Sequence, residues 1–483
     1  MIASRSDLLA VLRQFNPWWK NERMTDLPSW KRAVFGEVHQ WVTNPPAPRA
    51  LLLSGARQIG KTTLLLQSIE KLISDGVPPS QIIYATFDHP LLKLAGLDGL
   101  LELWREIEPA REGTEYLFLD EIQYTKDWQT WLKLQVDFHK GRRIAVTGSA
   151  SPLVAEGQES GMGRWHTVRL ATLSFYEYLQ IKRVSVPLLP SIAGLGELLE
   201  WSAIDCMRTA ADALPLTGHF YDYLMRGGFP QCAQVESVVA AQKLLREDIV
   251  DKVLKRDMTA LYGVRRVLEL EQTFLYLCLH DGGLLDMVDL GKNLEVKKPT
   301  AASYINLLEA AHLIHRLPPF GYGKEVLRGR YKVYLADAAI ASSVLLKGKS
   351  LLEDASAMGI AVETAFFKHL YARYYQQSVG FSYWRGKKNQ EVDIIAQVEG
   401  RLVPFEVKYR QQSTGWAELK GMLEFCKERK VQVGYVITKD SRDFGVIERE
   451  IEPGVTLRLI KIPAPLACYW LGKLEFEGCA TAF

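Results

Sequence analysis

The chain has 483 residues, of which 48% are hydrophobic and 24% charged; this balance is typical of soluble globular proteins, and the length predicts two to four domains. The formal net charge of +3 is too small to commit the whole molecule to nucleic acid. The six cysteines are scattered and contain no CxxC pair, which argues against a zinc site and a disulfide framework. The chain has neither the apolar core of a signal peptide nor a run of ~20 apolar residues, so we expect a cytoplasmic protein that spans no membrane.

Composition and hydrophobic pattern divide the chain into four regions. Residues 1–47 form an aromatic-rich arm that ends at the Pro-rich segment NPPAP. Residues 48–218 alternate apolar runs with helical stretches, which predicts a parallel α/β sheet, and they close with an insertion or connector at 184–218. Residues 219–345 are predicted to be mostly helical, and residues 346–483 return to a mixed α/β pattern.

Short apolar runs in the second and fourth regions have the length and composition of β-strands. They are Ala50–Ser54, Ile82–Phe87, Tyr116–Leu119 and Arg143–Thr147 in the second region, and Phe381–Trp384, Val392–Gln397, Leu402–Tyr409 and Val433–Thr438 in the fourth. The turn VEGR predicts that the second and third runs of the fourth region form a hairpin.

Residues 55–62 read GARQIGKT and match the pattern GxxxxGK[ST] between an apolar strand and an apolar helix, which is the context of a phosphate-binding loop. Gly55 and Gly60 permit a tight turn whose N–H groups point at phosphate oxygens, next to the positive end of the helix dipole. We expect Lys61 to reach the β- and γ-phosphates of ATP and the Thr62 hydroxyl to bind Mg²⁺. The residues expected to contact ATP are Gly55, Ala56, Arg57, Gln58, Ile59, Gly60, Lys61, Thr62, Thr63, Asp120 and Ser149.

The apolar run YLFL is followed by Asp120 and Glu121. A carboxylate at the carboxyl end of such a strand can hold Mg²⁺, directly or through water, so we assign this role to Asp120. Glu121 is then positioned to orient and activate the attacking water. The alternatives are a chance glycine-rich match for the loop and a helix N-cap for the DE pair.

Two further positions are candidates for sensing or stabilising the γ-phosphate. Thr147 or Ser149 follows the next strand, although strand ends also carry Ser and Thr for turn reasons. Arg164 is a candidate arginine finger, a group that usually acts on the nucleotide of a neighbouring subunit. A plain surface arginine is the alternative interpretation.

The order of motifs resembles a known family. The segments are GARQIGKTTL, LFLDEIQ, TGSAS, GRWHTVRLATLSFYEYL, MRGGFP, LKRDM, YKVYLAD, EVDII and FEVKYR. This series is similar to prokaryotic AAA-class ATPases with a C-terminal domain of unknown function, and the resemblance covers almost the whole chain from about residue 48. It implies an AAA+-like core that forms homo-oligomers, with Arg164 at the position of the family's GR motif. The resemblance does not indicate a substrate. The insertion at 184–218 is longer than the corresponding segment expected in the family, so the domain boundary there is left open.

A second cluster of polar residues lies near the C-terminus. Asp393 is on one predicted strand, and Glu406 and Lys408 share one face of the next because side chains alternate along a strand. Glu363, on a predicted helix, is a third carboxylate. The segment resembles the PD-(D/E)XK nuclease fold, in which two carboxylates bind Mg²⁺ and the lysine stabilises charge or orients water. Because close carboxylates repel one another unless a cation compensates, we expect Glu363, Asp393 and Glu406 to be metal ligands and Lys408 to be catalytic.

Basic residues near this cluster would attract a phosphate backbone; they are Arg385, Lys387, Lys388 and Arg410. Val392 stands where a proline often stands in that fold. The alternative keeps the fold without the activity, with Glu406 and Lys408 forming an ion pair on a binding scaffold.

The segment from Leu284 to Tyr334 reads as a winged helix. The face that would enter DNA is formed by Lys297, Lys298, Thr300, Ser303 and Tyr304. Winged helices also act as docking or lid modules without nucleic acid, and the modest positive charge here favours that role.

The sequence is therefore consistent with two functions. The first is an ATPase, catalytic through Lys61, Glu121 and Arg164, whose hydrolysis is coupled to DNA cleavage by Asp393, Glu406 and Lys408. The second is an ATP-dependent regulatory switch or assembly ATPase whose C-terminal domain is an inactive docking module for a protein partner that the sequence does not identify. Remodelling of protein substrates ranks last, because no pore-loop pattern stands out.

Overall fold

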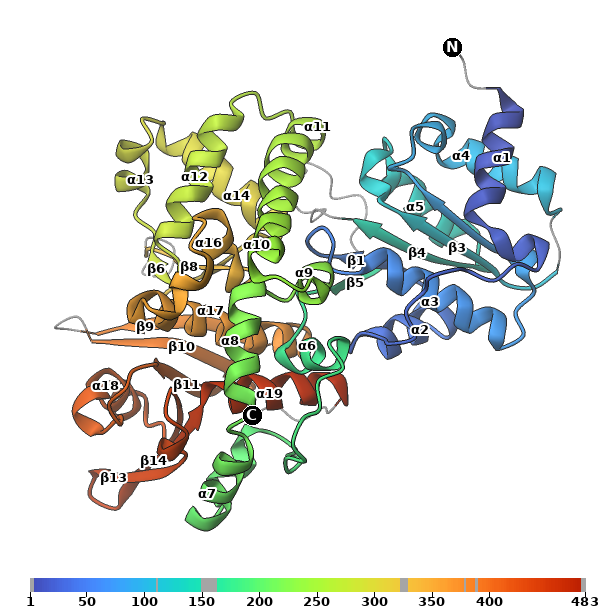
Figure 1. The fold of residues 1–483 in the computed structure, drawn as a ribbon. Helices are drawn as coiled ribbons and strands as arrows, with labels where there is room; N and C mark the ends of the chain where they lie inside the picture. The colour runs from blue at the N-terminus through green and yellow to red at the C-terminus, as the bar shows by residue number, and fades with distance from the viewer. Residues whose placement is uncertain are drawn as a thin grey trace. The chain divides into compact units, whose positions relative to one another are not determined.

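The computed structural model describes residues 4–109, 112–148, 163–321, 329–377, 379–386 and 390–478 (Figure 1). The chain forms two compact units. Unit 1 comprises Met1–Leu170 with Leu261–Gly263 and Ala310–His312, and unit 2 comprises Ala171–Ala260, Val264–Glu309 and Leu313–Phe483. Within the described residues no helix has both the length and the apolar character needed to cross a bilayer.

Unit 1 is built on a five-stranded parallel sheet with the order β2-β3-β4-β1-β5. The strands are β1 (Ala50–Ser54), β2 (Ile82–Thr86), β3 (Glu115–Asp120), β4 (Arg142–Gly148) and β5 (Trp165–Arg169), and the helices after β1, β2 and β3 are α3 (Lys61–Ser74), α4 (Pro90–Ile107) and α5 (Trp128–Phe138). The predicted parallel α/β sheet is confirmed, and β1 to β4 lie within one residue of the predicted runs at either end. Strand β5 was not among those runs, because its sequence WHTVR is only partly apolar.

The first part of the arm that precedes this sheet packs against β2, and its last helix packs against β1 and β4. It contains α1 (Arg5–Phe15), a short 3-10 helix (Pro17–Lys20) and α2 (Phe35–Thr43). Buried Asn16 donates to the carbonyl oxygen of Tyr84 at 2.9 Å and accepts from the Tyr84 N–H at 2.7 Å. The Trp19 indole N–H donates to the carbonyl oxygen of Ile82 at 2.9 Å. These bonds pair the backbone groups that β2 exposes at the edge of the sheet.

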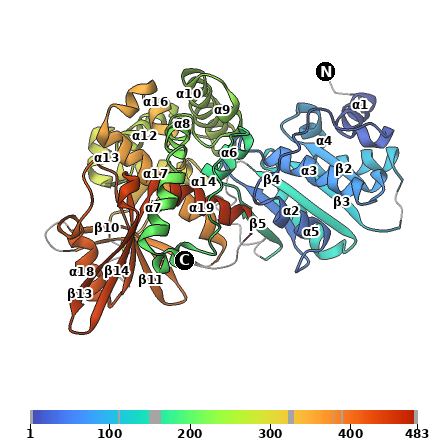
Figure 2. The ribbon, with the colours of Figure 1, turned by 60° about the horizontal axis from the view of Figure 1, so that its bottom comes forward.

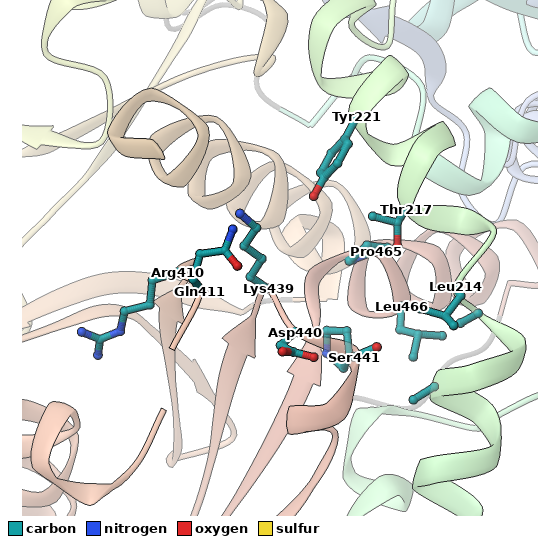
Figure 3. Close-up of a pocket in the computed structure, with 13 residues that line it drawn as sticks. Leu214, Thr217, Tyr221, Arg410, Gln411, Lys439, Asp440, Ser441, Pro465 and Leu466 are labelled. Atoms are coloured by element: carbon teal, nitrogen blue, oxygen red, sulfur yellow. The ribbon is translucent and has the colours of Figure 1, made fainter. Parts of the chain in front are cut away.

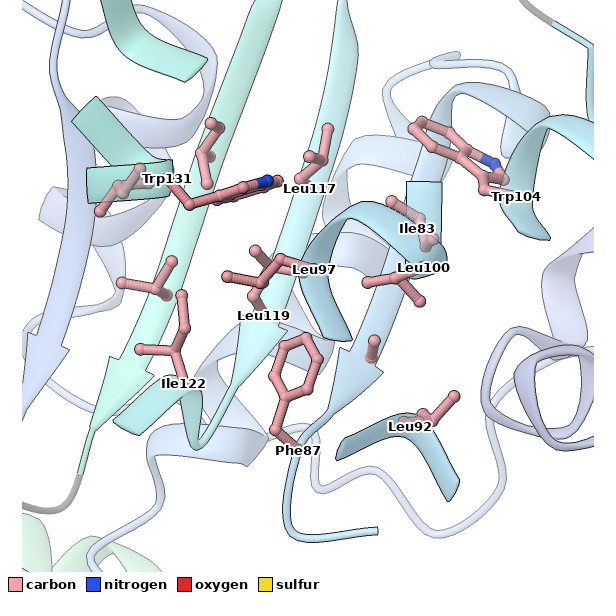
Figure 4. Packing of buried hydrophobic residues seen from close by; sticks show 14 of the residues in the cluster. Ile83, Phe87, Leu92, Leu97, Leu100, Trp104, Leu117, Leu119, Ile122 and Trp131 are labelled. Atoms are coloured by element: carbon pink, nitrogen blue, oxygen red, sulfur yellow. The ribbon is translucent and has the colours of Figure 1, made fainter. Parts of the chain in front are cut away.

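The core of unit 1 lies between the sheet and the helices α4 and α5 (Figure 4). Leu117 and Leu119 of β3 point to the same face because side chains alternate along a strand. They contact a cluster that includes Leu100 and Trp104 of α4 and Trp131 of α5. Burying each such side chain contributes about 1.5–3 kcal/mol, so the core holds the carboxyl ends of the strands in a fixed arrangement.

Unit 2 begins with a series of helices and a three-stranded antiparallel sheet of order β6-β8-β7. In chain order the elements are α6 (Phe175–Ile181), α7 (Ala203–Asp212), α8 (Leu216–Arg226), α9 (Pro230–Gln234), α10 (Val238–Arg246), a π-helix (Glu247–Asp257), α11 (Met258–Tyr262, which ends in unit 1), α12 (Val267–Leu279), β6 (Gly283–Leu284), α13 (Met287–Asn293), α14 (Lys298–Ala310, whose last residue belongs to unit 1), β7 (Ile314–Leu317), β8 (Lys332–Leu335) and α16 (Ala339–Val344).

The rest of unit 2 is a six-stranded mixed sheet of order β13-β14-β12-β11-β10-β9 (Figure 2). Its elements are α17 (Ala355–Tyr374), β9 (Gly380–Arg385), β10 (Glu391–Val398), β11 (Arg401–Lys408), α18 (Lys420–Arg429), β12 (Val433–Thr438), β13 (Gly445–Glu452), β14 (Val455–Pro463) and α19 (Ala464–Phe476). The predicted hairpin is present as β10 and β11. Val436 packs with α18, whereas Phe405 stacks on Tyr435 and contacts Phe366 of α17, so helices cover both faces.

The segment 184–218, which we placed with the N-terminal sheet, makes its described contacts in unit 2. Arg458 of β14 forms an ion pair with Glu200 at 2.9 Å, and the Trp470 indole N–H donates to the carbonyl oxygen of Pro190 at 3.0 Å. The sequence could not assign these partners, because they lie more than 250 residues away along the chain. The other domain limits that we inferred stay predictions.

Three of the motif segments meet at the buried carboxylate of Asp337. The side chain accepts from the Thr172 hydroxyl at 2.7 Å, from the Gly228 N–H at 2.9 Å and from the Ala339 N–H at 3.0 Å. A Cβ at Gly228 would lie 2.5 Å from the carbonyl oxygen of Leu173, so only glycine permits this approach. Asp337 thus joins the segments TLSF, GGFP and YLAD.

We expect Asp337→Ala to destabilise unit 2 by about 3 kcal/mol or more, because it leaves the buried Thr172 hydroxyl and the Gly228 N–H without an acceptor. Thermal unfolding would show a lower Tm, and hydrogen–deuterium exchange would show faster exchange at residues 227–230. The matched control is exposed Asp212→Ala, which should change neither. Equal stability of the two variants would contradict the role given to Asp337.

Candidate functional site

The predicted phosphate-binding loop connects β1 to α3. Gln58 and Gly60 adopt positive φ values of 60° and 97°, which turn the chain tightly before the helix starts at Lys61. The Lys61 ammonium is buried and donates to the carbonyl oxygens of Gly55 at 2.9 Å and Ala56 at 2.7 Å. The lysine therefore lies inside the curve of the loop, where phosphate oxygens bind in loops of this kind.

Gly55 is required by the neighbouring strand. The Leu170 N–H donates to the Ser54 carbonyl oxygen at 2.7 Å, which holds the end of β5 against the start of the loop. A Cβ at position 55 would lie 2.4 Å from the Leu170 carbonyl oxygen and 2.5 Å from Cδ1 of Ile59. The loop can therefore lie this close to the end of β5 because residue 55 has no side chain.

Asp120 lies at the carboxyl end of β3 and is 3% exposed. Its carboxylate accepts from the Thr62 hydroxyl at 2.8 Å, from the Tyr84 hydroxyl at 3.1 Å and from the Thr147 hydroxyl. Burial, and next the negative charge of Glu121, raise the pKa of Asp120, while these hydroxyls oppose the rise. The structure thus brings together Thr62 and Asp120, the two oxygen ligands assigned to Mg²⁺, since parallel strands end at one edge of a sheet.

Glu121 follows directly and has a left-handed backbone, with φ of 52°. Its N–H donates to the Thr147 hydroxyl at 2.9 Å, and its carboxylate accepts from the Gln123 amide. Thr147 on β4 therefore contacts both acidic residues, as its position between β1 and β3 permits. Sequence reasoning missed Tyr84 and Gln123, because a tyrosine in a strand and a glutamine in a turn carry no signal for this site.

Arg164 lies at the opposite end of the sheet. It precedes β5, whose Trp165 pairs with Ala50 at the start of β1, and its guanidinium forms an ion pair with Asp137 at 2.6 Å. The residue of β5 that pairs with Ser54, next to the loop, is Arg169. Arg164 therefore does not lie at the nucleotide edge of its own sheet. Ser149, the other predicted sensor, lies outside the described residues.

The second predicted site is in unit 2, where Asp393 and Glu406 lie opposite each other on β10 and β11. The Asp393 N–H donates to the Glu406 carboxylate at 3.3 Å, and the Val407 N–H donates to the Asp393 carboxylate at 2.9 Å. Lys408 forms an ion pair with Glu406. The hairpin therefore brings the three predicted residues together.

A lysine that the sequence did not single out lies among these carboxylates. The ammonium nitrogen of Lys332, on β8, is 2.8 Å from Glu363 Oε1, 3.0 Å from Asp393 Oδ1 and 3.1 Å from Glu391 Oε1. Its side chain is 4% exposed. The only available signal was a lysine in the otherwise apolar strand KVYL.

Burial and the contacts within the cluster shift the pKa values of its acidic and basic side chains. Burial alone would lower the pKa of Lys332, but Asp393 and Glu363 outweigh it and the pKa is raised well above its usual value. Burial would raise the pKa of Asp393, but Lys332 and Lys408 hold it below its usual range. Burial and the charge of Asp393 raise the pKa of Glu406 to about 8. Asp393 and Lys332 are thus a charged pair.

The donor set around Asp393 does not fit a divalent cation as arranged. Mg²⁺ needs oxygen ligands at about 2.0–2.1 Å around one point, whereas Glu363, Glu391 and Asp393 converge on an ammonium nitrogen. Across the described ranges, no group of three or more His, Cys, Asp or Glu side chains could hold a metal ion. Of the nearby basic residues, Arg385 and Arg410 are exposed, while Lys387 and Lys388 lie outside the described residues.

A pocket of about 210 Å³ lies at the carboxyl ends of β11, β12 and β14 (Figure 3). Arg410 and Lys439 follow β11 and β12; Figure 3 shows the Tyr221 hydroxyl of α8 pointing toward the Lys439 ammonium group, whereas the Arg410 side chain points away from Tyr221. The lining contains neither Asp393 nor Glu406 nor Lys408. The pocket is therefore separate from the carboxylate cluster.

The face of α14 that we assigned to DNA is only partly exposed. Lys297, Lys298 and Ser303 are exposed, but Tyr304 is 7% exposed and its hydroxyl donates to Glu269 at 3.0 Å. The inclusion of Tyr304 in that face was wrong, because the side chain is buried and its hydroxyl is bonded to Glu269 of α12.

Family models match three parts of the chain. Residues 47–179 match an AAA domain. Residues 217–351 and 358–458 match two domains of unknown function, DUF8612 and DUF4143. With the parallel sheet and the loop between β1 and α3, the first match supports an AAA-type P-loop ATPase domain in this part of the chain.

Relatives of similar length are uncharacterized. A protein of Haemophilus influenzae is 26% identical over 374 residues, 74% of this chain and 82% of its own length. One of Mycobacterium tuberculosis is 26% identical over 74% of this chain and 70% of its own length, and one of Methanocaldococcus jannaschii is 24% identical over 80% of each.

Solved structures resemble the chain only distantly. AMPPCP-bound DnaA from Aquifex aeolicus is 15% identical, with a TM-score of 0.24 over 61% of this chain and 92% of its own. PCH-2 of C. elegans is 13% identical, with a TM-score of 0.25 over 47% of this chain and 58% of its own. Likeness at this level carries no argument about this chain.

We expect Gly55→Ala to weaken ATP binding by about tenfold or more, equivalent to ~1.4 kcal/mol, because the added Cβ displaces the loop from Leu170. Titration with a fluorescent ATP analogue measures the loss. Gly36→Ala, in α2 of the same unit with no atom within 4 Å of the added Cβ, is the control and should bind normally. Equal affinity of the two variants would contradict this role of Gly55.

Proposed function

We propose that the protein binds and hydrolyses ATP through the loop at residues 55–62 and the acidic pair that ends β3. The observation that carries the proposal is the 2.8 Å hydrogen bond between the Thr62 hydroxyl and the Asp120 carboxylate. It joins the end of the phosphate-binding loop to the acidic strand. Both groups are oxygen ligands of the kind that Mg²⁺ prefers.

Each residue at this edge has a distinct role in the proposed reaction. The backbone N–H groups of the loop and the Lys61 ammonium would bind the β- and γ-phosphates. Thr62 and Asp120 would hold Mg²⁺, which neutralises charge on the phosphates. Glu121 would orient the attacking water and accept its proton, while Thr147 holds the Glu121 backbone in place.

The position of Arg164 supports action between copies of the chain. It lies at the amino end of β5, whereas the loop follows the carboxyl end of β1. An arginine finger at this place would reach the nucleotide of a neighbouring copy rather than its own. We therefore propose a homo-oligomer in which Arg164 leaves Asp137 and contacts the next subunit's ATP.

For the C-terminal part, which we interpret as a winged helix followed by a nuclease-like domain, two roles were open. One is metal-dependent cleavage of DNA coupled to ATP hydrolysis, and the other is docking. The ion pairs of Lys332 favour docking, because the carboxylates that would bind the metal are already bound to an ammonium group. We propose an ATP-dependent switch or assembly ATPase whose C-terminal domain binds a partner.

We expect Glu121→Gln to bind ATP normally and to hydrolyse it about 10²–10⁴-fold more slowly, since it removes the general base. Lys61→Ala should impair binding, hydrolysis or both. The measurements are phosphate release and nucleotide titration on each purified variant. Hydrolysis by Glu121→Gln at the wild-type rate would remove Glu121 from the mechanism.

We expect no DNA cleavage that depends on Asp393. The assay uses single-stranded, duplex and branched DNA with Mg²⁺ or Mn²⁺, with and without ATP, and compares the wild type with Asp393→Ala. Cleavage that is lost in the variant would establish a nuclease and reject the docking role. An ATP requirement for that cleavage would show that the two activities are coupled.

A further inference from the structure

Lys332 is surrounded by acidic groups from two other elements. Glu363 belongs to α17, and Glu391 and Asp393 belong to β10. An ammonium group has three N–H donors and no acceptor. The three carboxylate oxygens lie at 2.8, 3.0 and 3.1 Å, so their number matches the number of donors.

Burial makes this arrangement specific. The Lys332 side chain is 4% exposed and that of Asp393 is 13% exposed, so water supplies little compensation to either. A buried charge without partners is strongly unfavourable, and several carboxylates without a cation repel one another. The ammonium group therefore neutralises the repulsion between the carboxylates, and the carboxylates compensate the buried positive charge of Lys332.

Two further hydrogen bonds hold the carboxylates that contact Lys332. The Tyr334 hydroxyl, two residues along β8, donates to Glu363 at 2.6 Å. The second oxygen of Asp393 accepts from the Val407 N–H at 2.9 Å. Both carboxylates are thus oriented toward Lys332 by bonds that do not involve it.

We propose that Lys332 is the resident cation of this cluster, in place of a divalent metal, and that it fastens β8 to α17 and β10. The cluster then joins the three-stranded sheet to the six-stranded sheet, as a docking domain with a fixed internal arrangement requires. A metal ion could enter only if the ammonium left, and a lysine side chain that is 4% exposed and held by three ion pairs has little freedom to leave. The inference deepens the docking role proposed above.

The test measures metal binding and unfolding without nucleotide, so that the outcome does not depend on ATP hydrolysis. We expect Mn²⁺, followed by electron paramagnetic resonance, to show no Asp393-dependent site in the wild type, and EDTA or Mg²⁺ to leave its Tm unchanged. Lys332→Met should unfold at a lower Tm and should gain a Mn²⁺ site that restores the Tm. Adding Asp393→Asn to Lys332→Met should abolish that gain.

The matched control is Lys349→Met, which removes an exposed lysine of the same unit and should change neither property. A Mn²⁺ site in the wild type that Asp393→Asn removes would overturn the inference, as would a Tm of Lys332→Met equal to that of the wild type. If Lys332→Met does not fold, the fastening role is supported and the wild-type titration alone decides whether metal is excluded. Normal ATPase activity together with a wild-type Mn²⁺ site that Asp393→Asn removes would reject this inference and leave the ATPase proposal intact.

Discussion

A charged group that leaves water must find its compensation inside the protein, and this constraint governs the polar sites of both units. In unit 1, Asp120 is surrounded by the hydroxyls of Thr62, Tyr84 and Thr147. In unit 2, the positive charge of Lys332 is compensated by carboxylates from α17 and β10. The two solutions differ in chemistry. Hydroxyl groups satisfy Asp120 without neutralising it, whereas the carboxylates around Lys332 already have their cation.

This difference separates two sets of acidic residues that look alike in the sequence. Asp120 accepts hydrogen bonds from hydroxyl groups, at an edge where Thr62 is exposed. In the function that we propose, a cation that arrives with a nucleotide would be bound there. Asp393 holds an internal ammonium group in a buried position. The surroundings of Asp120 suit a reaction, and the ion pairs of Lys332 suit a stable connection of β8 to α17 and β10.

The motifs that supported the family resemblance have a physical explanation in unit 2. TLSF, GGFP and YLAD are distant in the chain, yet Thr172, Gly228 and Asp337 share one buried hydrogen-bond network. Nearby, the Lys368 ammonium donates to the Leu173 carbonyl oxygen at 2.6 Å. Leu173 lies three residues after Leu170, whose N–H donates to the Ser54 carbonyl oxygen just before the phosphate-binding loop. Thr172, Gly228 and Asp337 are small or polar because the segments TLSF, GGFP and YLAD approach one another closely at these residues.

The sequence by itself determined the parallel sheet, the phosphate-binding loop, the acidic pair at 120–121 and the hairpin that brings Asp393 to Glu406. The single strands, the loop, the acidic pair and the hairpin depend on neighbours within a short stretch, through strand alternation, glycine conformation and turn length. The parallel sheet follows from the alternation of strands with helices along the chain. Only the tertiary structure decided the partners of Asp120 on β2 and β4, the position of Arg164 at the far end of β5, and the lysine inside the carboxylate cluster. Lys332 is 61 residues from Asp393, and no local pattern specifies which cation will meet a buried carboxylate when strands from different sheets pack together.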